Sequence, residues 1–253
     1  MARPPALDAL DPLRAQPSRA GVLTDFDGTL ASIVDDPATA RPLDGVREEL
    51  ARLADRFAVV AVLSGRPVSF LQQFLPPTVV LSGLYGLEVV RDGVRADNPL
   101  GRPWRGVIED VVDAVRADGP DGMRIESKGL SLTLHYRGEP DLAPRVLAIA
   151  EQQAVRSGLE VRAARMSVEL HPPIEVDKGT ALRDLAAGLE AACFMGDDLG
   201  DLAAFRALDG LAREGAHVVR IAVRSEETPP ALLEAADLVV DGPEGARDVL
   251  AQL

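Results

Sequence analysis

Two short acidic clusters are the parts of this 253-residue chain best suited to chemistry. Asp25–Thr29 (DFDGT) follows the apolar run 21–24, and Gly196–Asp201 (GDDLGD) follows the apolar run 191–195. Such runs predict buried strands of a parallel sheet, whose carboxyl ends meet at one edge. Carboxylates gathered there repel one another unless a cation lies among them, and oxygen ligands favour a hard ion such as Mg²⁺. The clusters therefore predict an enzyme with a magnesium-bound carboxylate site.

The first cluster has the spacing of a nucleophile and a proton carrier. Asp25 and Asp27 are two residues apart, so on an extended segment their side chains point the same way. One carboxylate can attack an electrophile while the other handles protons. A phosphoryl group suits this arrangement, because Mg²⁺ neutralises both the carboxylate and the phosphoryl oxygens. The alternative is that Asp-Gly-Thr forms an ordinary turn after a strand.

Two later segments offer groups that can hold an anion. The Ser64 hydroxyl and the backbone N–H groups of Gly65 and Arg66 lie between a predicted strand and a predicted helix, which indicates an anion-binding loop. Serine is also a common helix cap. Lys178 lies in the first turn of the helix predicted at 178–190, where a cation opposes the helix dipole, so it indicates an anionic partner. Alternatively, Asp177 caps that helix and Lys178 points to water.

The second cluster holds more carboxylates than helix capping explains. If the helix predicted at 199–208 begins near Asp198, then Asp197 and Asp201 share one of its faces. Capping accounts for one of these aspartates and, less easily, for two. Three carboxylates this close raise one another's pKa unless a cation is present.

The composition of the chain indicates which classes of binding partner and which location to expect. A net charge of −13 argues against nucleic acid, because no basic surface is available to displace phosphate counterions. The longest apolar run, Phe57–Leu63, is too short to cross a bilayer, and no secretory pattern is found at the amino terminus. The single cysteine, Cys193, excludes a disulfide framework. We expect a cytoplasmic monomer that binds a small anionic substrate and neither nucleic acid nor membrane.

The order of predicted elements divides the chain into an α/β core and an insert. Strands and helices alternate over 18–100 and again over 173–253, which predicts a parallel sheet flanked by helices. Residues 101–172 follow the order α-β-β-α-β-β instead, and we expect them to form a smaller α+β cap domain. The proline-rich residues 1–17 are expected to be a flexible lead-in.

The predicted cap strands have one polar and one apolar face. Their residues alternate with period two, so that every second side chain shares a face. Two cap helices can cover the apolar face. The polar face would suit a hydroxyl-rich molecule if it looks toward the carboxylates, but it would equally suit solvent. Its members are Arg124, Glu126, Lys128, Ser131, Thr133, His135, Arg137, Arg165, Ser167 and Glu169.

The ordered motifs resemble the four-motif signature of the haloacid dehalogenase superfamily, which has a Rossmann-like core. This resemblance implies that Asp25 is a nucleophile forming an aspartyl-phosphate, that Asp27 is the general acid and base, and that Ser64 and Lys178 hold the phosphate. It also implies the metal ligands. Mg²⁺ would be held by the Asp25 carboxylate, the Asp27 backbone carbonyl and Asp197, with Asp198 at the metal directly or through water and Asp201 close by.

Finer matches resemble the trehalose-6-phosphate phosphatases, which carry the second cap type of this superfamily. The matching segments are 81–88 (LSGLYGLE), 126–128 (ESK), 135–137 (HYR), 166–172 (MSVELHP) and 177–179 (DKG). The resemblance implies magnesium-dependent hydrolysis of trehalose 6-phosphate to trehalose and phosphate. It implies sugar contacts from five residues of the polar cap face: Glu126, Lys128, Arg137, Arg165 and Glu169.

Two alternatives stay open at this point. The chain departs from the family pattern at Tyr85, Arg165 and His171, so the substrate could be another sugar phosphate, such as sucrose phosphate or a glucosyl- or mannosylglycerate phosphate. The chain could also be a non-catalytic sugar-phosphate sensor. Sensors often lose the nucleophile or its neighbour, whereas this chain keeps both.

Overall fold

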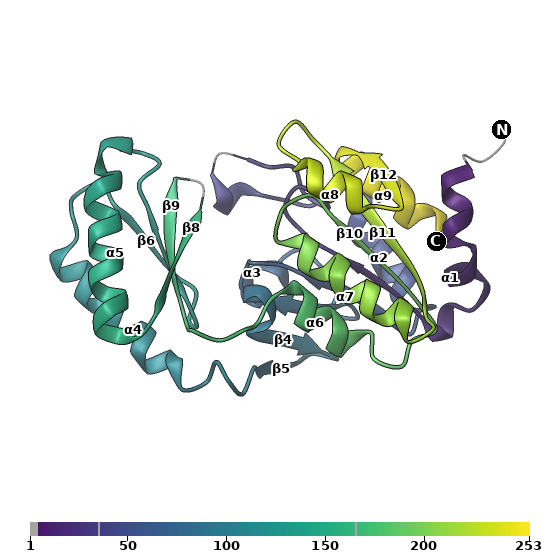
Figure 1. Ribbon diagram of the computed structural model, residues 1–253, viewed down its shortest axis with the longest axis horizontal. Helices are drawn as coiled ribbons and strands as arrows, with labels where there is room; N and C mark the ends of the chain where they lie inside the picture. Colours follow the sequence, from purple (N-terminus) through teal and green to yellow (C-terminus); the bar gives the residue numbers. More distant parts are fainter. Residues whose placement is uncertain (1–4, 35, 165) are drawn as a thin grey trace. The chain divides into compact units, whose positions relative to one another are not determined.

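The computed structural model describes residues 5–34, 36–164 and 166–253. The chain forms two compact units (Figure 1). The core unit comprises Met1–Ala96 and Val176–Leu253, and the inserted unit comprises Asp97–Glu175. Each unit has its own hydrophobic core. Within the described residues, no helix is both long and apolar enough to cross a lipid bilayer.

The core unit is built on a mainly parallel sheet. Among the described residues its strands lie in the order β12-β11-β10-β1-β2-β3-β4-β5. The pairs from β12 to β3 are parallel, and β4 turns back antiparallel to β3. The strands are β1 (Ala20–Thr24), β2 (Val59–Leu63), β3 (Val80–Gly83), β4 (Glu88–Arg91), β5 (Val94–Asp97), β10 (Ala191–Gly196), β11 (His217–Arg224) and β12 (Leu238–Asp241).

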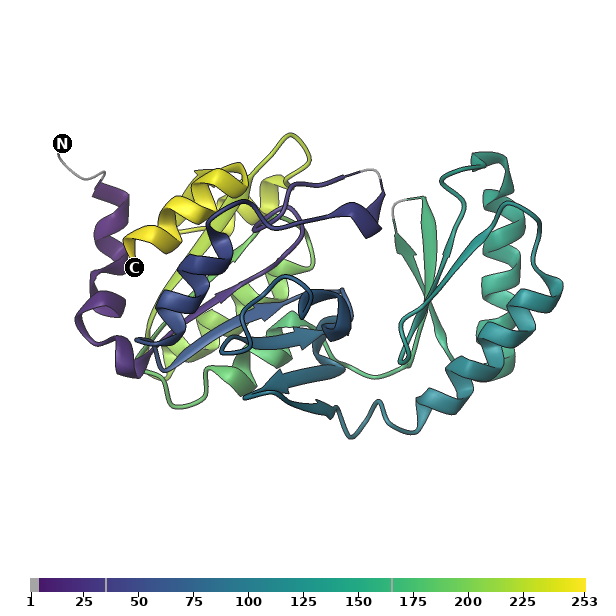
Figure 2. The same ribbon diagram turned by 180° about the vertical axis from the view of Figure 1, so that it is seen from behind.

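Helices cover both faces of this sheet, which explains why its central strands are apolar throughout. In β1, Val22 packs into the core cluster on one face and Leu23 into the cluster on the other. Figure 1 shows α6 and α7 on one face, and Figure 2 shows α2 and α9 on the opposite face. The predicted α/β fold class is confirmed. The helices are α1 (Asp11–Ala15), α2 (Val46–Ala54), α3 (Val68–Leu71), α6 (Lys178–Leu185), α7 (Asp201–Arg213), α8 (Pro230–Ala235) and α9 (Gly242–Gln252).

Two helices differ from the lengths that the sequence predicts. The helix predicted over 178–190 ends at Leu185, and a turn containing Gly188 (φ 79°) follows it. The helix predicted over 199–208 begins at Asp201 and continues to Arg213.

Of the segment 1–17 that is expected to be a flexible lead-in, residues 1–4 lie outside the described residues, and the described part has helical structure. Pro5–Leu10 form a 3₁₀ helix that leads directly into α1. Leu10 and Leu13 are fully buried in the core cluster. Arg14 Nε donates a hydrogen bond of 2.7 Å to the carbonyl of Gln252, and α1 lies on the same side of the core unit as the carboxyl-terminal end of α9 (Figure 1). Apolar burial therefore fixes a segment whose prolines suggested disorder.

The inserted unit has the predicted α-β-β-α-β-β order. Its described strands form an antiparallel sheet in the order β6-β7-β9-β8, and α4 and α5 pack on one face of that sheet (Figure 2). Leu132, Leu134, Val168 and Leu170 turn toward these helices and are fully buried. The elements are α4 (Trp104–Asp118), β6 (Arg124–Ser127), β7 (Leu132–His135), α5 (Ala143–Ser157), β8 (Glu160–Ala164) and β9 (Ser167–His171).

Candidate active site

Three neighbouring parallel strands bring distant parts of the sequence to one edge of the core sheet. β1 lies between β10 and β2, and the loops after these strands carry Asp25, Asp197 and Ser64. The Asp25 N–H donates a hydrogen bond of 2.8 Å to the Met195 carbonyl, which ties the first loop to β10. Strand order therefore creates the predicted cluster of carboxylates.

Asp25, Asp197 and Asp201 form a buried acidic triad. One carboxylate oxygen of each lies within 4.8 Å of the other two. Burial, reinforced by the neighbouring carboxylates, raises the pKa of Asp197 to about 7. Burial likewise raises the pKa of Asp25 well above its ordinary value, although Lys178 opposes this rise. Buried carboxyl groups with raised pKa values are typical of sites where a cation or a reacting group completes the arrangement.

Lys178 supplies the positive charge closest to this triad. Its Nζ lies 2.8 Å from Asp25 Oδ1 and 2.6 Å from Asp201 Oδ1. Burial alone would lower the pKa of Lys178, but the attraction of Asp201 and Asp25 holds it well above its ordinary value. One ammonium group among three carboxylates leaves two negative charges when all are ionised, which matches the charge of a divalent cation.

Asp177 caps α6, which agrees with one half of the alternative prediction for this segment. The other half is wrong, because Lys178 does not point to water. Asp177 Oδ1 accepts a hydrogen bond of 2.7 Å from the Thr180 N–H. The Thr180 hydroxyl accepts one of 2.9 Å from the Asp177 N–H. This reciprocal cap fixes the first turn of α6, from which Lys178 enters the triad with only 3% of its surface exposed.

Asp201 organises the second acidic loop. Its Oδ2 accepts the backbone N–H groups of Asp197 and Asp198, at 2.8 and 3.1 Å, while its Oδ1 accepts Lys178. This closes residues 197–200 into a loop and delays the start of α7. Asp198, expected at the metal, is exposed and is not part of the triad. The sequence signal for Asp201 was its spacing of four from Asp197, which did not distinguish it from Asp198.

Gly28 allows the two acidic loops to meet. It has a φ of 76°, and a Cβ there would lie 2.0 Å from Asp197 Oδ2. The neighbouring Thr29 hydroxyl donates a hydrogen bond of 3.2 Å to Asp197 Oδ1. Only glycine fits this position, because it tolerates positive φ and leaves room for the carboxylate.

Asp27 lies outside the triad and is held by Arg66. Arg66 Nε and Nη2 donate to its two carboxylate oxygens at 2.8 and 2.7 Å. Arg66 Nη1 donates to the Pro37 carbonyl at 2.6 Å, and its guanidinium lies over the Phe70 ring. Arg66 was expected to contact the substrate. Its partnership with Asp27 was not predicted.

A second loop supports the one that carries Ser64. Ser64 is 1% exposed, and its hydroxyl accepts the Arg66 N–H at 3.1 Å. Leu84 and Tyr85 have φ values of 51° and 59°, a left-handed conformation that costs roughly 1–2 kcal/mol per residue. Their N–H groups donate to the carbonyls of Arg66 and Ser64, both at 3.0 Å. Such strain persists where the surroundings over-determine the conformation, so this loop is rigidly built.

Glu88 anchors the other end of the same loop. This carboxylate is 1% exposed, accepts the Val68 N–H at 3.0 Å where α3 begins, and pairs with Arg95. The residues that follow Arg66 are thereby fixed to β4. In the sequence, Glu88 ends the matching segment 81–88, and no local pattern predicts its contacts.

The polar face of the inserted unit carries two anchored carboxylates. Strand register aligns Glu126, Thr133 and Glu169 in a row across β6, β7 and β9. His135 Nε2 lies 2.9 Å from Glu126, while Glu169 accepts the Ser131 hydroxyl at 2.7 Å and lies 3.4 Å from Lys128 Nζ.

Two other predicted sugar contacts stand apart from this row. Arg137 follows β7 and is half-buried. Arg165 lies outside the described residues.

A family model and curated relatives agree on one family. A family model described as trehalose-phosphatase matches residues 23–233. A trehalose-phosphate phosphatase of Mycobacterium ulcerans (strain Agy99) is 33% identical over 237 residues, which cover 88% of this chain and 59% of that protein. One of Mycobacterium leprae (strain TN) is 34% identical over 204 residues, covering 74% and 47%. The chain thus spans about half the length of these curated relatives.

A solved structure extends the similarity to three dimensions. The crystal structure of a protein described as trehalose-6-phosphate phosphatase related superposes with a TM-score of 0.78. The two sequences are 26% identical, and the match covers 92% of this chain and 96% of that one.

Proposed function

The chain belongs to the trehalose-phosphatase family, and from that premise we propose that it hydrolyses trehalose 6-phosphate to trehalose and phosphate. The observation that carries this proposal is the contact of Asp25 with Lys178 inside the buried acidic triad. A carboxylate held against a buried ammonium is oriented for attack, and the ammonium offsets charge on an incoming phosphate.

The proposed reaction has two steps. In the first, an Asp25 oxygen attacks phosphorus, the bond from phosphorus to the sugar oxygen breaks, and Asp27 gives that oxygen a proton. In the second, Asp27 takes a proton from water, the water oxygen attacks phosphorus, and Asp25 is released with inorganic phosphate. Ser64, the N–H groups of Gly65 and Arg66, and Lys178 would hold the phosphate. The Arg66 pair supports this role for Asp27, because its two hydrogen bonds fix the orientation of both carboxylate oxygens.

The donor atoms at the site fit Mg²⁺. The Asp25 and Asp197 carboxylates and the Asp27 carbonyl would hold it, and Asp198 would act through water. Both oxygens of Asp201 already accept hydrogen bonds, which supports a role for Asp201 in orienting the loop and Lys178. Bound Mg²⁺ would neutralise the phosphoryl oxygens and the attacking carboxylate. Oxygen-only donors are the set that this hard cation prefers.

The sugar would bind on the polar face of the inserted unit. Glu126 and Glu169 are anchored acceptors for sugar hydroxyls, and Lys128 is a donor beside them. Arg137 and Arg165 complete the proposed set. The net charge of −13 supports a small-molecule substrate rather than nucleic acid. The cytoplasmic location and the monomeric state stay predictions.

Phosphate release from a panel of sugar phosphates tests this function. We expect trehalose 6-phosphate to exceed sucrose 6-phosphate and glucosylglycerate phosphate by about tenfold or more in kcat/KM. EDTA should abolish turnover. Asp25→Asn should reduce kcat by about 10³-fold or more, while the exposed control Asp248→Asn on α9 should not. Preference for another sugar phosphate would overturn the substrate assignment. A chain that binds trehalose 6-phosphate without releasing phosphate would be a sensor.

A further inference from the structure

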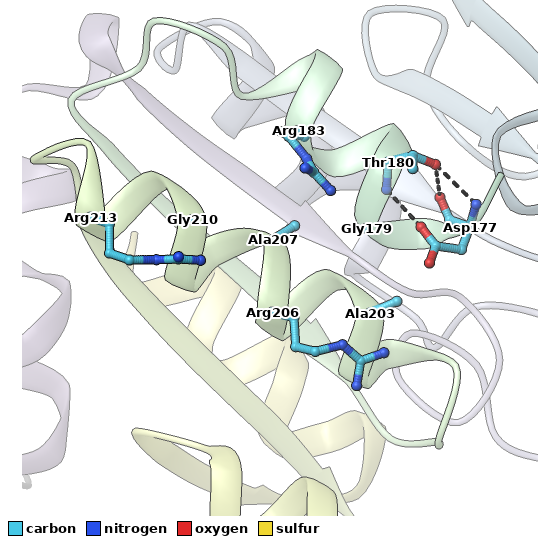
Figure 3. Close-up of a pocket in the computed structure, with 9 residues that line it drawn as sticks. All are labelled: Asp177, Gly179, Thr180, Arg183, Ala203, Arg206, Ala207, Gly210 and Arg213. Carbon is cyan, nitrogen blue, oxygen red and sulfur yellow. Dashed lines mark hydrogen bonds between the residues drawn. The ribbon is translucent and has the colours of Figure 1, made fainter. Parts of the chain in front are cut away.

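A groove between α6 and α7 has no part in the reaction described above. It has a volume of about 270 Å³ and continues into a second hollow of about 250 Å³ that shares four of its lining residues. Its polar rim is formed by Arg183, Arg206 and Arg213, and its floor by Gly179, Ala203, Ala207 and Gly210. We call this space the arginine groove (Figure 3).

The spacing along α7 produces this shape. Arg206 and Arg213 are two helical turns apart, and the small residues between them lie on the same face. Figure 3 shows Arg183 projecting from α6 into the space between the helices, while Arg206 and Arg213 extend along α7. Positions 203 to 213 of α7 span about 15 Å, so the groove is elongated.

The charge of the groove is opposite to that of the chain as a whole. Three arginines gather here on a chain of net charge −13. Arg183 and Arg206 form no salt bridge with any described residue, and Arg213 donates only to the carbonyl of Asp209, at 3.1 Å. The acidic lining residues are Asp177, whose Oδ1 accepts the Thr180 N–H, and Glu214 at the far end. The rim therefore keeps an excess of positive charge.

We propose that the arginine groove binds a small phosphorylated anion that carries at least two phosphate groups. Guanidinium groups grip phosphate oxygens through paired hydrogen bonds, and several arginines spaced along a groove suit several linked phosphates. The floor of glycine and alanine leaves room for the anion. It offers no aromatic ring on which a nucleobase could stack. A ligand here would contact Asp177 and Gly179, the residues on either side of Lys178.

Inorganic tripolyphosphate, titrated calorimetrically in buffer with EDTA, is the direct probe. Without a metal ion, the acidic triad repels anions, so binding reports on the groove. We expect a Kd of roughly 0.1 mM at low salt. The triple variant Arg183→Gln, Arg206→Gln, Arg213→Gln should weaken binding by about tenfold or more. The matched control removes three exposed arginines from α4 and α5, by Arg116→Gln, Arg145→Gln and Arg156→Gln, and should bind like the wild type.

A second pair of variants keeps all the arginines. A Cβ at Gly210 meets no atom within 4 Å, so Gly210→Glu places a carboxylate in the groove without a clash, and Gly210→Gln places a neutral group of the same size. Only the glutamate should abolish binding. Unchanged affinity for tripolyphosphate in the triple variant or in Gly210→Glu would overturn the proposal. An equal loss of affinity in the matched control, whether the triple variant of α4 and α5 or Gly210→Gln, would also overturn it. Tighter binding of a hexaglutamate peptide would overturn it in favour of an acidic protein partner.

Discussion

Arg66 holds both carboxylate oxygens of Asp27, at 2.8 and 2.7 Å, while Asp25, two residues earlier, is held by Lys178 at 2.8 Å. The two aspartates thus have separate cations. The Asp25 side chain is 5% exposed, whereas the Asp27 side chain is 32% exposed. The proposed nucleophile, Asp25, and the proposed proton carrier, Asp27, therefore differ both in their cationic partner and in their exposure to solvent.

Arg66→Gln should lower kcat for phosphate release by about 10²-fold, because Asp27 loses the fork that orients it for proton transfer. Arg66→Lys should recover part of this loss, since an ammonium keeps the charge but cannot pair with both oxygens in the same plane. Steady-state kinetics at saturating Mg²⁺ measure both. Arg116→Gln, at an exposed ion pair on α4, is the control. A kcat unchanged in Arg66→Gln would contradict the role given to this pair.

Gly28→Ala should weaken Mg²⁺ binding and turnover, because its Cβ would lie 2.0 Å from Asp197 Oδ2 and force that carboxylate to move. Gly93→Ala is a matched control. Gly93 has nearly the same φ, 74° against 76°, but an added Cβ there meets no atom within 4 Å. Both variants carry the cost of positive φ, roughly 1 kcal/mol. Only Gly28→Ala should lose affinity for Mg²⁺ in a calorimetric titration. Equal losses of affinity in the two variants would contradict the explanation by a clash with Asp197.

Asp201→Asn should lower the free energy of unfolding by about 3 kcal/mol, because Lys178 keeps its charge in a buried place with one partner fewer. In addition, the asparagine amide has a single oxygen, so its NH₂ must face either the N–H groups of Asp197 and Asp198 or the Lys178 ammonium. Asp209→Asn, on the same helix, removes a half-exposed partner of Arg220 and should cost about 1 kcal/mol or less. Urea denaturation in EDTA compares the two. A smaller loss at position 201 than at 209 would refute this account.

The affinity for Mg²⁺ should rise about tenfold from pH 6 to pH 8, because the metal displaces the proton from Asp197. Its pKa of about 7 in the folded chain lies above the ordinary 3.8. Without metal, protonation of Asp197 therefore contributes stability that is full below pH 4 and is lost as the pH rises through 7. Calorimetric titrations at both pH values measure the affinity. Asp197→Asn should bind weakly at both, and a wild-type Kd independent of pH would disprove the linkage.

Glu169→Gln should raise KM for trehalose 6-phosphate by about tenfold and leave kcat within about twofold, because it removes an acceptor for a sugar hydroxyl and changes none of the groups proposed to act on phosphorus. Glutamine can still accept the Ser131 hydroxyl, so the fold should persist. Glu109→Gln, exposed on α4, is the control. A fall in kcat without a change in KM would assign Glu169 a different role.

Local sequence patterns were sufficient to predict the fold class and the edge where the carboxylates meet. The apolar runs before Asp25 and Asp197 marked strands, and parallel strands place their carboxyl ends together. Patterns could not show which aspartate of the second cluster turns inward. That depends on the hydrogen bonds that Asp201 accepts from two backbone N–H groups, which form only after the loop closes.

Contacts between distant segments escaped prediction for the same reason. The Arg66 side chain reaches Asp27 across neighbouring loops, and no local spacing encodes that pairing. Leu10 and Leu13 are buried against strands that lie much later in the chain. The local sequence does not show this burial, and the neighbouring prolines alone favour a flexible segment. Roles for the individual site residues stay predictions until the variants above are measured.

The position of β10 in the core sheet has a consequence for synthesis on the ribosome. When Glu175 has emerged, all the described strands of the inserted unit have been made, but the core sheet still lacks the strand that separates β1 from β11. β1 must therefore wait for a neighbour encoded some 170 positions downstream. Such long-range closure is slow, and the exposed flank of β1 is a surface on which nascent chains can mispair. Chaperone demand should accordingly peak before β10 is released.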